Sequence, residues 1–154
     1  MTKKLSNKQE NALQTFKSGL NCAQSVLIAF QDEKNPETEI VMAMAAGFGG
    51  GMGRLQQTCG ALTGAFMAIG QHCNSHYETN ELIKEKSRRL IQNIHSKFIH
   101  LHKVSDCKSL LGIDLNLEEG RNKMKEKNLQ ELVCEQCVLN AVALLEDEFS
   151  REQK

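Results

Sequence analysis

Apolar residues recur at spacings of three and four along most of the chain, which is the period of an amphipathic α-helix. Runs of β-branched residues are few, and the sequence contains a single proline, one tyrosine and no tryptophan. It therefore offers little material for β-strands. We find no internal repeat and no linker. The pattern predicts one all-α domain over residues 1–154, a multi-helix bundle of about seven helices.

Capping and turn residues mark the ends of the expected helices. Gly19 suits the position just after a helix, because glycine readily takes the left-handed conformation found there. Asn21 can cap the following helix, and Pro36 suits the first turn of the next one. The helix from residue 59 is apolar on nearly every side, which predicts a central position. The expected helices are 7–18, 22–33, 37–47, 59–72, 80–102, 105–112 and 129–149, with a glycine-rich loop over 47–53 and a charged segment before the last helix.

Composition narrows the class of protein. Lys+Arg and Asp+Glu both total 19, so no net charge attracts the chain to nucleic acid. The chain has no run of 18 apolar residues, which argues against membrane insertion, and its first residues lack the apolar segment of a secretory signal. We therefore expect a cytoplasmic protein whose six cysteines stay reduced. Catalytic, redox or metal-binding roles for these cysteines follow from that expectation.

Three cysteines fall in the first turn of an expected helix. They are Cys22, Cys59 and Cys107, close behind the expected capping residues Asn21, Thr58 and Ser105. Unpaired N–H groups and the helix dipole favour a negative charge there and lower the pKa of a thiol. The resulting thiolate is both the nucleophile of thiol chemistry and the form that binds metals. The alternative is that these cysteines are small core residues, as free cysteines often are.

The glycine-rich loop does not match a nucleotide-binding motif. Met52 and Arg54 occupy the third glycine positions of G-x-G-x-x-G, and no Gly-Lys-Ser or Gly-Lys-Thr follows. Backbone N–H groups of such a loop can nevertheless form a concave site for an anion, here the Cys59 thiolate or a sulfur species attached to it. The candidate binding residues are Gly49, Gly50, Gly51, Gly53 and Arg54. The alternative is a tight helix crossing, made by Gly60 and Gly64.

Four segments carry a resemblance to a known family. In chain order they are "GLNCAQSVLIAF", "GFGGGMGRLQQTCGALTGAFMAIG", "CKSLLGIDL" and "CEQCVLNAVALLEDE", which together cover most of the sequence. On these segments the chain resembles the C_GCAxxG_C_C family of redox-active proteins, which is named for its cysteine pattern. The resemblance implies a thiol redox function and places the CGAxxG motif at residues 59–64. It also implies that the four family cysteines are Cys22, Cys59, Cys107 and Cys134.

Some residues depart from the family pattern. Gln56 stands where such proteins tend to have a further glycine, a change that could alter the shape of the loop. Cys137 replaces a more usual aromatic or aliphatic residue, and Cys73 has no counterpart among the four family cysteines. We predict that Cys73 and Cys137 are packing residues. Cys134 and Cys137 do not form a thioredoxin-type redox motif, because they are expected in the middle of a helix.

The histidines give no clear catalytic constellation. His72 and His76 could present metal ligands together with Cys73, but Asn74, Ser75 and Tyr77 suggest that the helix ends before them. The remaining histidines are predicted to serve solvation or packing, and these are His95, His100 and His102.

Two functions remain open from the sequence. In the first, Cys59 attacks a disulfide or an oxidised sulfur species and another of the four family cysteines resolves the mixed disulfide. This chemistry requires no cofactor, and the partner would be a thiol-redox protein or a sulfur-containing small molecule. In the second, Cys22, Cys59, Cys107 and Cys134 bind zinc, iron or an iron–sulfur cluster. The wide spacing of these cysteines favours the redox function, since short ligand loops are absent. The oligomeric state is left open.

Overall fold

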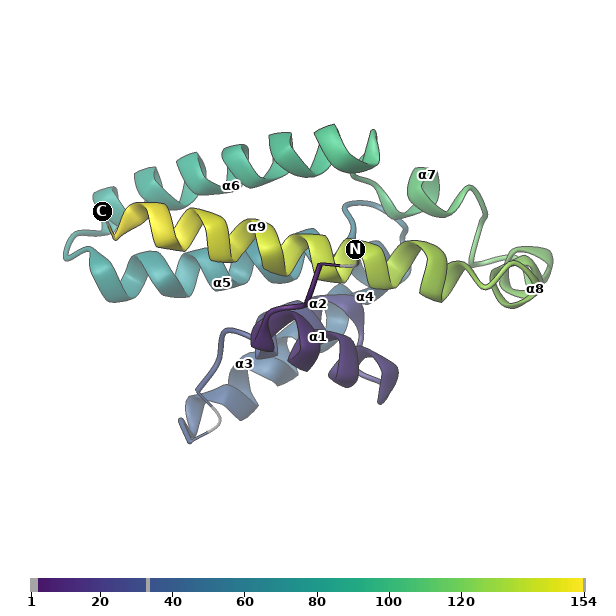
Figure 1. The fold of residues 1–154 in the computed structure, drawn as a ribbon, viewed down its shortest axis with the longest axis horizontal. Coiled ribbons are helices and arrows are strands. Elements are labelled where there is room, and N and C mark those ends of the chain that lie inside the picture. Colours follow the sequence, from purple (N-terminus) through teal and green to yellow (C-terminus); the bar gives the residue numbers. More distant parts are fainter. Residues whose placement is uncertain (1–2, 33, 154) are drawn as a thin grey trace.

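Three long helices lie along one another and form the body of the computed structural model, which describes residues 3–32 and 34–153 (Figure 1). They are α5 (Gly60–His76), α6 (Asn80–His102) and α9 (Gln136–Glu152). A short turn joins α5 to α6, and α9 packs against both. No β-strand occurs in the part of the chain that is described. The prediction of an all-α, multi-helix fold is therefore confirmed.

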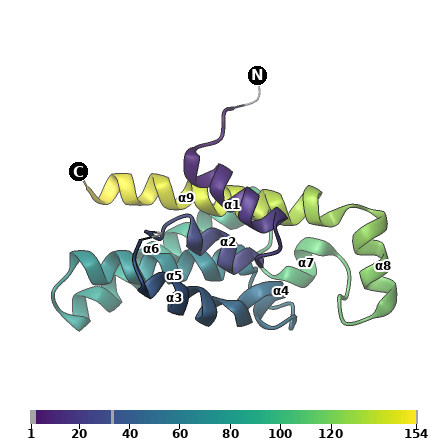
Figure 2. The same cartoon turned by 90° about the horizontal axis from the view of Figure 1, so that it is seen from below.

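The N-terminal third of the chain crosses this body on one side (Figure 2). It consists of α1 (Asn7–Lys17), α2 (Cys22–Ile28), α3 (Glu37–Ala45), the 3₁₀ turn η1 (Ala46–Phe48) and α4 (Gly49–Met52). Helix α2 packs mainly on α5, and α1 packs on α2 and α9. The N-terminal segment therefore covers two of the three long helices.

The remaining elements gather at one end of the long helices. They are α7 (Cys107–Leu111), α8 (Glu118–Glu126) and the π-helical turn η2 (Gln130–Glu135), which continues directly into α9. Figure 1 shows α7 and α8 beyond the end of α6, with the chain then returning through η2 into α9. The start of α5 lies at this same end, so several helix termini meet there.

The apolar core follows the three long helices. Leu62 and Ile69 of α5 and Phe98 of α6 are fully buried. The same holds for Val142 and Leu145 of α9. Burying a side chain of this size contributes about 1.5–3 kcal/mol. The core fixes the positions of α5, α6 and α9, and thereby the positions of the residues at their ends.

Several predicted boundaries are wrong for local reasons. Helix α2 was expected to reach residue 33, which lies outside the described residues, but it ends at Ile28. The chain leaves the helix there because the N–H groups of Phe30 and Gln31 donate to the carbonyls three residues earlier, those of Leu27 and Ile28. Helix α5 continues to His76, since the polar Ser75 hydroxyl donates back to the Gln71 carbonyl within the helix.

The charged segment before the last predicted helix also differs from expectation, because it forms α8. Residues 49–52, expected within the glycine-rich loop, form the short turn α4. The described residues thus contain nine α-helical segments, some very short, against about seven expected. None of these helices is long and apolar enough to cross a membrane.

Candidate functional site

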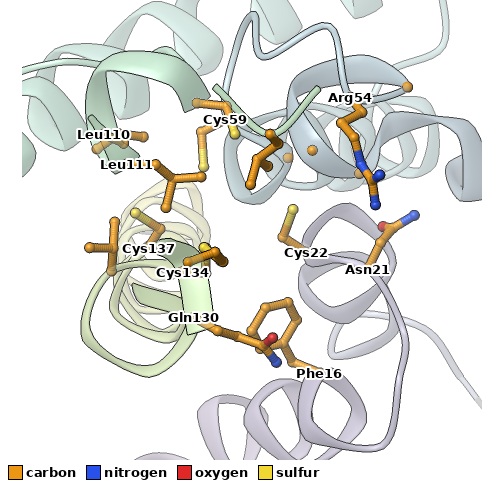
Figure 3. Close-up of a pocket in the computed structure, with 18 of the residues that line it drawn as sticks. Phe16, Asn21, Cys22, Arg54, Cys59, Leu110, Leu111, Gln130, Cys134 and Cys137 are labelled. Atoms are coloured by element: carbon orange, nitrogen blue, oxygen red, sulfur yellow. The ribbon is translucent and has the colours of Figure 1, made fainter. Parts of the chain in front are cut away.

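Five cysteines line one cavity of about 470 Å³ at the end of the molecule where the helix termini meet. Figure 3 shows the cavity with Arg54 and Asn21 at one side and Leu110 and Leu111 at the other. Its walls come from α1, α2, the glycine-rich segment, the start of α5, α7, η2 and α9. The lining cysteines are Cys22, Cys59, Cys107, Cys134 and Cys137, and all are free thiols.

Two chain segments far apart in sequence hold Cys59 and Cys107 side by side. The Cys59 N–H donates to the Ser105 carbonyl at 2.8 Å, and the Cys107 N–H donates to the Gln57 carbonyl at 2.7 Å. Thr58 and Asp106 pair between these bonds as an isolated antiparallel bridge. Cys59 thereby becomes the N-cap residue of α5, and Cys107 becomes the first residue of α7.

This bridge corrects two predicted caps. Thr58 was expected to cap the helix that carries Cys59, but its backbone is used in the bridge and Cys59 itself is the N-cap. Asp106, not Ser105, caps α7, because its carboxylate accepts from the Ser109 N–H at 2.8 Å. Both cysteines remain at helix N-termini in spite of these one-residue shifts.

Two glycines of the CGAxxG motif bring α2 against α5. A Cβ atom at Gly60 would overlap the Sγ atom of Cys22, and one at Gly64 would overlap the backbone carbonyl of Ala23. The tight helix crossing that the sequence left as an alternative is therefore present. It also serves the site, since Cys22 reaches the cavity only because position 60 carries no side chain.

The π-helical turn η2 supplies another wall of the cavity. π-Helices are rare and occur mostly as single turns, often at functional sites. Here the turn carries Gln130, Val133 and Cys134 to the cavity, and Cys137 follows one residue after α9 begins. Figure 3 shows Cys134 and Cys137 next to each other, facing the side from which Cys59 comes.

Cys59 lies where a negative charge is stabilised. A hydrogen-bonding interaction with the Cys137 thiol is the main cause that lowers the pKa of Cys59 below the ordinary value of a thiol. Burial opposes this effect, and the N–H groups of Ala61 and Leu62 in the first turn of α5 lower the pKa further. The side chain is 7% exposed, so a thiolate at this position is shielded from bulk water but open to the cavity.

The neighbouring thiols are held in the protonated form. Burial raises the pKa of Cys107 and of Cys134 to about 12, and repulsion from the other cavity thiols, when these ionise, adds to the effect. Burial also raises the pKa of Cys22. The interaction with Cys59 raises the pKa of Cys137, so of the two thiols Cys137 holds its proton more firmly. Cys59 is therefore the thiol of this cluster that ionises most readily.

The glycine-rich segment takes conformations that favour glycine. The φ angles of Gly50, Gly51 and Gly53 are +63°, +69° and +60°. A Cβ at Gly51 would also lie 2.7 Å from the Cα of Gln56. Gly49 differs, with φ at −69°, and it is required for space, since a Cβ there would lie 2.5 Å from the Cβ of Asn21.

The glycine-rich segment also faces the Cys22 thiol. The N–H of Gly50 acts on Cys22, whose pKa it lowers against the effect of burial. The N–H groups that lower the pKa of Cys59 come from α5 itself. Gly49, Gly50, Gly53 and Arg54 do line the cavity.

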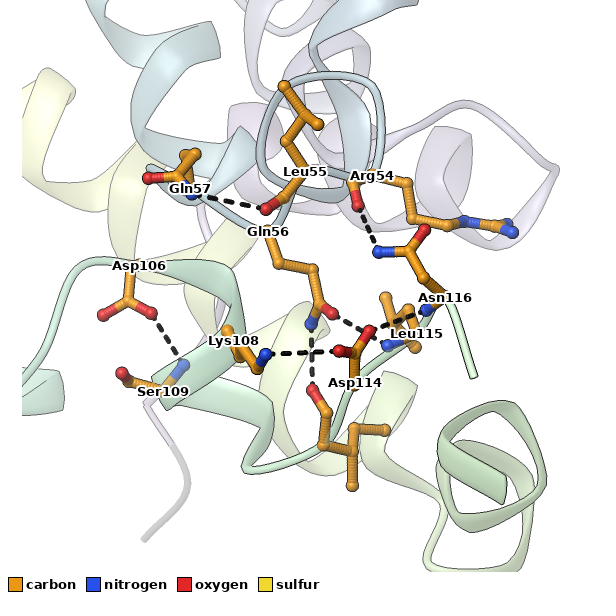
Figure 4. Close-up of polar contacts among 11 residues, drawn as sticks. Arg54, Leu55, Gln56, Gln57, Asp106, Lys108, Ser109, Asp114, Leu115 and Asn116 are labelled. Atoms are coloured by element: carbon orange, nitrogen blue, oxygen red, sulfur yellow. Dashed lines mark hydrogen bonds and ion pairs between the residues drawn. The ribbon is translucent and has the colours of Figure 1, made fainter. Parts of the chain in front are cut away.

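Gln56 closes the glycine-rich segment in a conformation that is more usual for glycine. Its φ is +54°, which is the left-handed region that favours glycine. The buried side chain donates to the Ile113 carbonyl at 3.1 Å and accepts from the Leu115 N–H at 2.8 Å (Figure 4). These bonds hold the conformation and tie the segment to the chain after α7, so the substitution does not open the loop.

Cys137 and His102 are the residues whose roles the sequence missed. The packing role predicted for Cys137 is incomplete, because its thiol interacts with Cys59 and lies 3.9 Å from Nδ1 of His102. The His102 ring packs on Phe98, as expected of a packing residue, but its Nε2 also lies 3.1 Å from the amide nitrogen of Asn140. The signal available in the sequence was the three-residue spacing of Cys134 and Cys137.

Cys73 behaves as predicted for a packing residue. It is fully buried in the apolar core near the end of α5 and does not line the cavity. His72 and His76 lie one turn apart on the extended α5, and their rings stack on each other.

The sequence left open a metal site made by the four family cysteines. Within the described residues, no group of three or more His, Cys, Asp or Glu side chains is arranged to hold a metal ion. The thiols surround a cavity and interact pairwise.

Residues 20–148 match the family described as "Putative redox-active protein (C_GCAxxG_C_C)". The matched region contains every cysteine of the chain and every residue that lines the cavity except Phe16. No curated protein and no solved structure matches the chain.

Proposed function

The chain belongs to the C_GCAxxG_C_C family of redox-active proteins, and from this premise we propose that it is a thiol–disulfide oxidoreductase in which Cys59 is the nucleophile and Cys137 the resolving thiol. The observation that carries the proposal is that these two thiols line one cavity and shift each other's pKa in opposite directions. The pKa of Cys59 is lowered and that of Cys137 is raised, which is the arrangement that a dithiol needs before it meets a disulfide.

The first step is attack by the Cys59 thiolate on one sulfur of a disulfide substrate. A new S–S bond joins Cys59 to that half of the substrate, while the substrate S–S bond breaks and the other half leaves as a thiolate that takes a proton from solvent. Loss of the charge on Cys59 removes the main cause that raises the pKa of Cys137. Cys137 therefore ionises more readily after the first step than before it.

The second step is attack by the Cys137 thiolate on the sulfur of Cys59. The mixed disulfide breaks, the second half of the substrate leaves as a thiolate, and a Cys59–Cys137 disulfide forms. Two electrons pass from the two protein thiols to the substrate disulfide. An external dithiol returns the protein to its reduced form by the reverse exchange.

The cavity supports a small or narrow substrate with an apolar body. Its volume is about 470 Å³, and much of its wall is apolar, as at Phe16, Leu110 and Val133. Arg54 adds a positive charge at one side of the cavity (Figure 3). A sulfur-containing small molecule or the cysteine side chain of a partner protein fits this description. Cys22, Cys107 and Cys134 line the path as protonated thiols and are further candidates for exchange.

The experiment uses protein reduced and purified without oxygen. One equivalent of an aromatic disulfide that releases a coloured thiol is added, and the modified residues are located by peptide mass spectrometry. We expect a Cys59–Cys137 disulfide in the native chain and a stable mixed disulfide on Cys59 in the Cys137→Ala variant. Cys73→Ala is the matched control and should react as the native chain does.

Two results would overturn the proposal. One is a mixed disulfide that forms on another cysteine while Cys59 stays free. The other is tightly bound zinc or iron in stoichiometric amount that protects the thiols until it is removed, which would favour the metal-binding alternative. Metal content and free thiols are measured on the same sample.

A further inference from the structure

A chain of polar contacts leads from the surface of α9 to Cys59. The amide nitrogen of Asn140 lies 3.1 Å from Nε2 of His102, and Nδ1 of the same ring lies 3.9 Å from the sulfur of Cys137. Cys137 and Cys59 line the same cavity, where the Cys137 thiol lowers the pKa of Cys59. Four side chains from α6, α9 and the start of α5 are therefore connected in one line that ends in the cavity.

The direction of the hydrogen bonds follows from the donors present. An amide nitrogen can only donate, so Nε2 of His102 accepts from Asn140 and carries no proton. Burial lowers the pKa of His102, and the ring is therefore neutral near pH 7 with its single proton on Nδ1. Nδ1–H then points to the sulfur of Cys137, at a distance expected for a hydrogen bond to sulfur. Cys137 uses its own proton toward Cys59.

We infer that His102, oriented by Asn140, is a positioning residue for the reactive thiol pair: it donates Nδ1–H to Cys137 and thereby directs the Cys137 proton to Cys59. Each hydrogen bond in the line strengthens the next one, because connected hydrogen bonds in a buried environment polarise one another. The arrangement deepens the proposed function and rests on its assignment of Cys59 and Cys137 as the reacting pair.

The same contact assists the second step of the exchange. When Cys59 is held in a mixed disulfide, Cys137 must lose its proton and carry a negative charge. Nδ1–H of His102 is a hydrogen-bond donor already placed at that sulfur. His102 thus supports the negative charge wherever the pair carries it, on Cys59 before the first step and on Cys137 before the second.

Other titratable groups act on the pair as well. The charges that act on Cys137 come from Cys59, Cys134 and Cys22, and Glu135 acts on Cys134. His102 differs from these four groups, because it is a neutral imidazole whose tautomer is fixed by Asn140. Substitution at position 102 alone therefore separates its effect on the Cys59 pKa from theirs. The carboxylate of Glu135 pairs with Lys17 at 3.6 Å.

The test is a pH titration of thiolate absorbance near 240 nm in the reduced protein, which needs no substrate. The first titration step is assigned to Cys59 by its loss in Cys59→Ala. In His102→Phe, which keeps a ring on Phe98, we expect this midpoint to rise by about one pH unit and alkylation by iodoacetamide at pH 7 to slow roughly tenfold. Asn140→Leu should also raise the midpoint, but by less, because the His102 ring can then carry its proton on either nitrogen.

The matched control is His100→Phe, which replaces an exposed imidazole on the same helix. It should leave the Cys59 midpoint unchanged. If His102→Phe does not fold, as judged by its circular dichroism, Asn140→Leu carries the test alone. The inference is overturned if the foldable variants keep the native midpoint within about 0.2 units while Cys137→Ala shifts it.

The outcome is separable from that of the proposed function. A raised midpoint in His102→Phe together with a native chain that never forms a Cys59–Cys137 disulfide would refute the exchange reaction and leave the hydrogen-bond line intact. An unchanged midpoint in a protein that does form this disulfide would refute the role of His102 and leave the exchange reaction standing.

Discussion

Helix α5 carries a cysteine at its beginning, Cys59, and another near its end, Cys73. Cys59 is the N-cap, where N–H groups of the first turn and the Cys137 thiol stabilise a negative charge beside a cavity. Cys73 is fully buried, and its carbonyl accepts the N–H of Tyr77 in the closing turn. At that end the helix dipole disfavours an anion. The same residue type on one helix thus lines the cavity at one end and packs in the core at the other.

The glycines of α5 divide in the same way. Gly60 and Gly64, in the first half, are the positions at which α2 approaches so closely that no Cβ fits. Gly70, in the second half, has open space where its Cβ would be. The first half of α5 is therefore shaped by the site, and the second half follows the ordinary rules of a core helix. Each prediction below compares the two halves or the thiols that face them.

The largest expected effect separates the two cysteines of α5. Cys59→Ala should slow reduction of an aromatic disulfide by roughly 1000-fold or more, because the nucleophile is lost. Cys73→Ala should stay within about twofold of the native rate, since its thiol does not reach the cavity. Stopped-flow absorbance of the released thiol measures both. Equal losses in the two variants would mean that the two ends of α5 do not differ in function.

The second prediction compares two glycines by unfolding in urea. Gly64→Ala should lower the free energy of unfolding by about 1–3 kcal/mol, because the added methyl group meets the backbone of Ala23. Gly70→Ala should raise it by about 0.5–1 kcal/mol, since alanine favours the helix and no atom lies in its way. A stabilising Gly64→Ala would show that α2 and α5 are not in close contact.

The third prediction concerns the thiol that faces Cys59 from α9. Cys137→Ala removes the main cause that lowers the pKa of Cys59, so the midpoint of Cys59 alkylation should rise by about one pH unit. Cys134→Ala removes a neighbouring thiol that is not among these causes and should shift the midpoint far less. A larger shift in Cys134→Ala than in Cys137→Ala would show that Cys134, and not Cys137, is the partner of Cys59.

The last expected effect is a loss of stability in alkali. The pKa of Cys107 and of Cys134 is about 12 in the folded chain, whereas an unfolded thiol titrates near about 8.5. Between these values the folded state binds more protons than the unfolded state, so stability falls as the pH rises from about 8.5 toward 12. Urea unfolding across this range should show the decline. The variants Cys107→Ala and Cys134→Ala should each reduce its slope, and unchanged slopes would contradict the burial assigned to these thiols.

The fold could be predicted from the sequence to a large extent, because its signals are local. The period of apolar residues gave the all-α class, and the cap at Asn21 gave the start of α2. Family membership likewise followed from motifs that can be read directly in the chain. The ends of α2 and α5 were less accurate, because they depend on bonds that form only at the termini.

The site could be predicted only in part, because its key contacts join distant segments. The bridge between Thr58 and Asp106 has no local signature, yet it decides that Cys59 is an N-cap. The contact of Cys137 with His102 depends on how α9 packs on α6 and on the π turn before α9. No spacing in the sequence relates these two residues, so Cys137 was assigned to packing and His102 to solvation or packing.

The most direct test of the account is the rate at which each cysteine of the reduced, metal-free chain is alkylated by iodoacetamide across a pH series. Peptide mass spectrometry locates the modified residues. Exposure alone would favour Cys22 and Cys134, which are half-buried, over the more buried Cys59. We predict instead that Cys59 reacts fastest near pH 7, with a midpoint below about 8.5, because its pKa is lowered whereas those of Cys22 and Cys134 are raised. A Cys59 that reacts no faster than Cys22, Cys134 or Cys73 would contradict its assignment as the nucleophile.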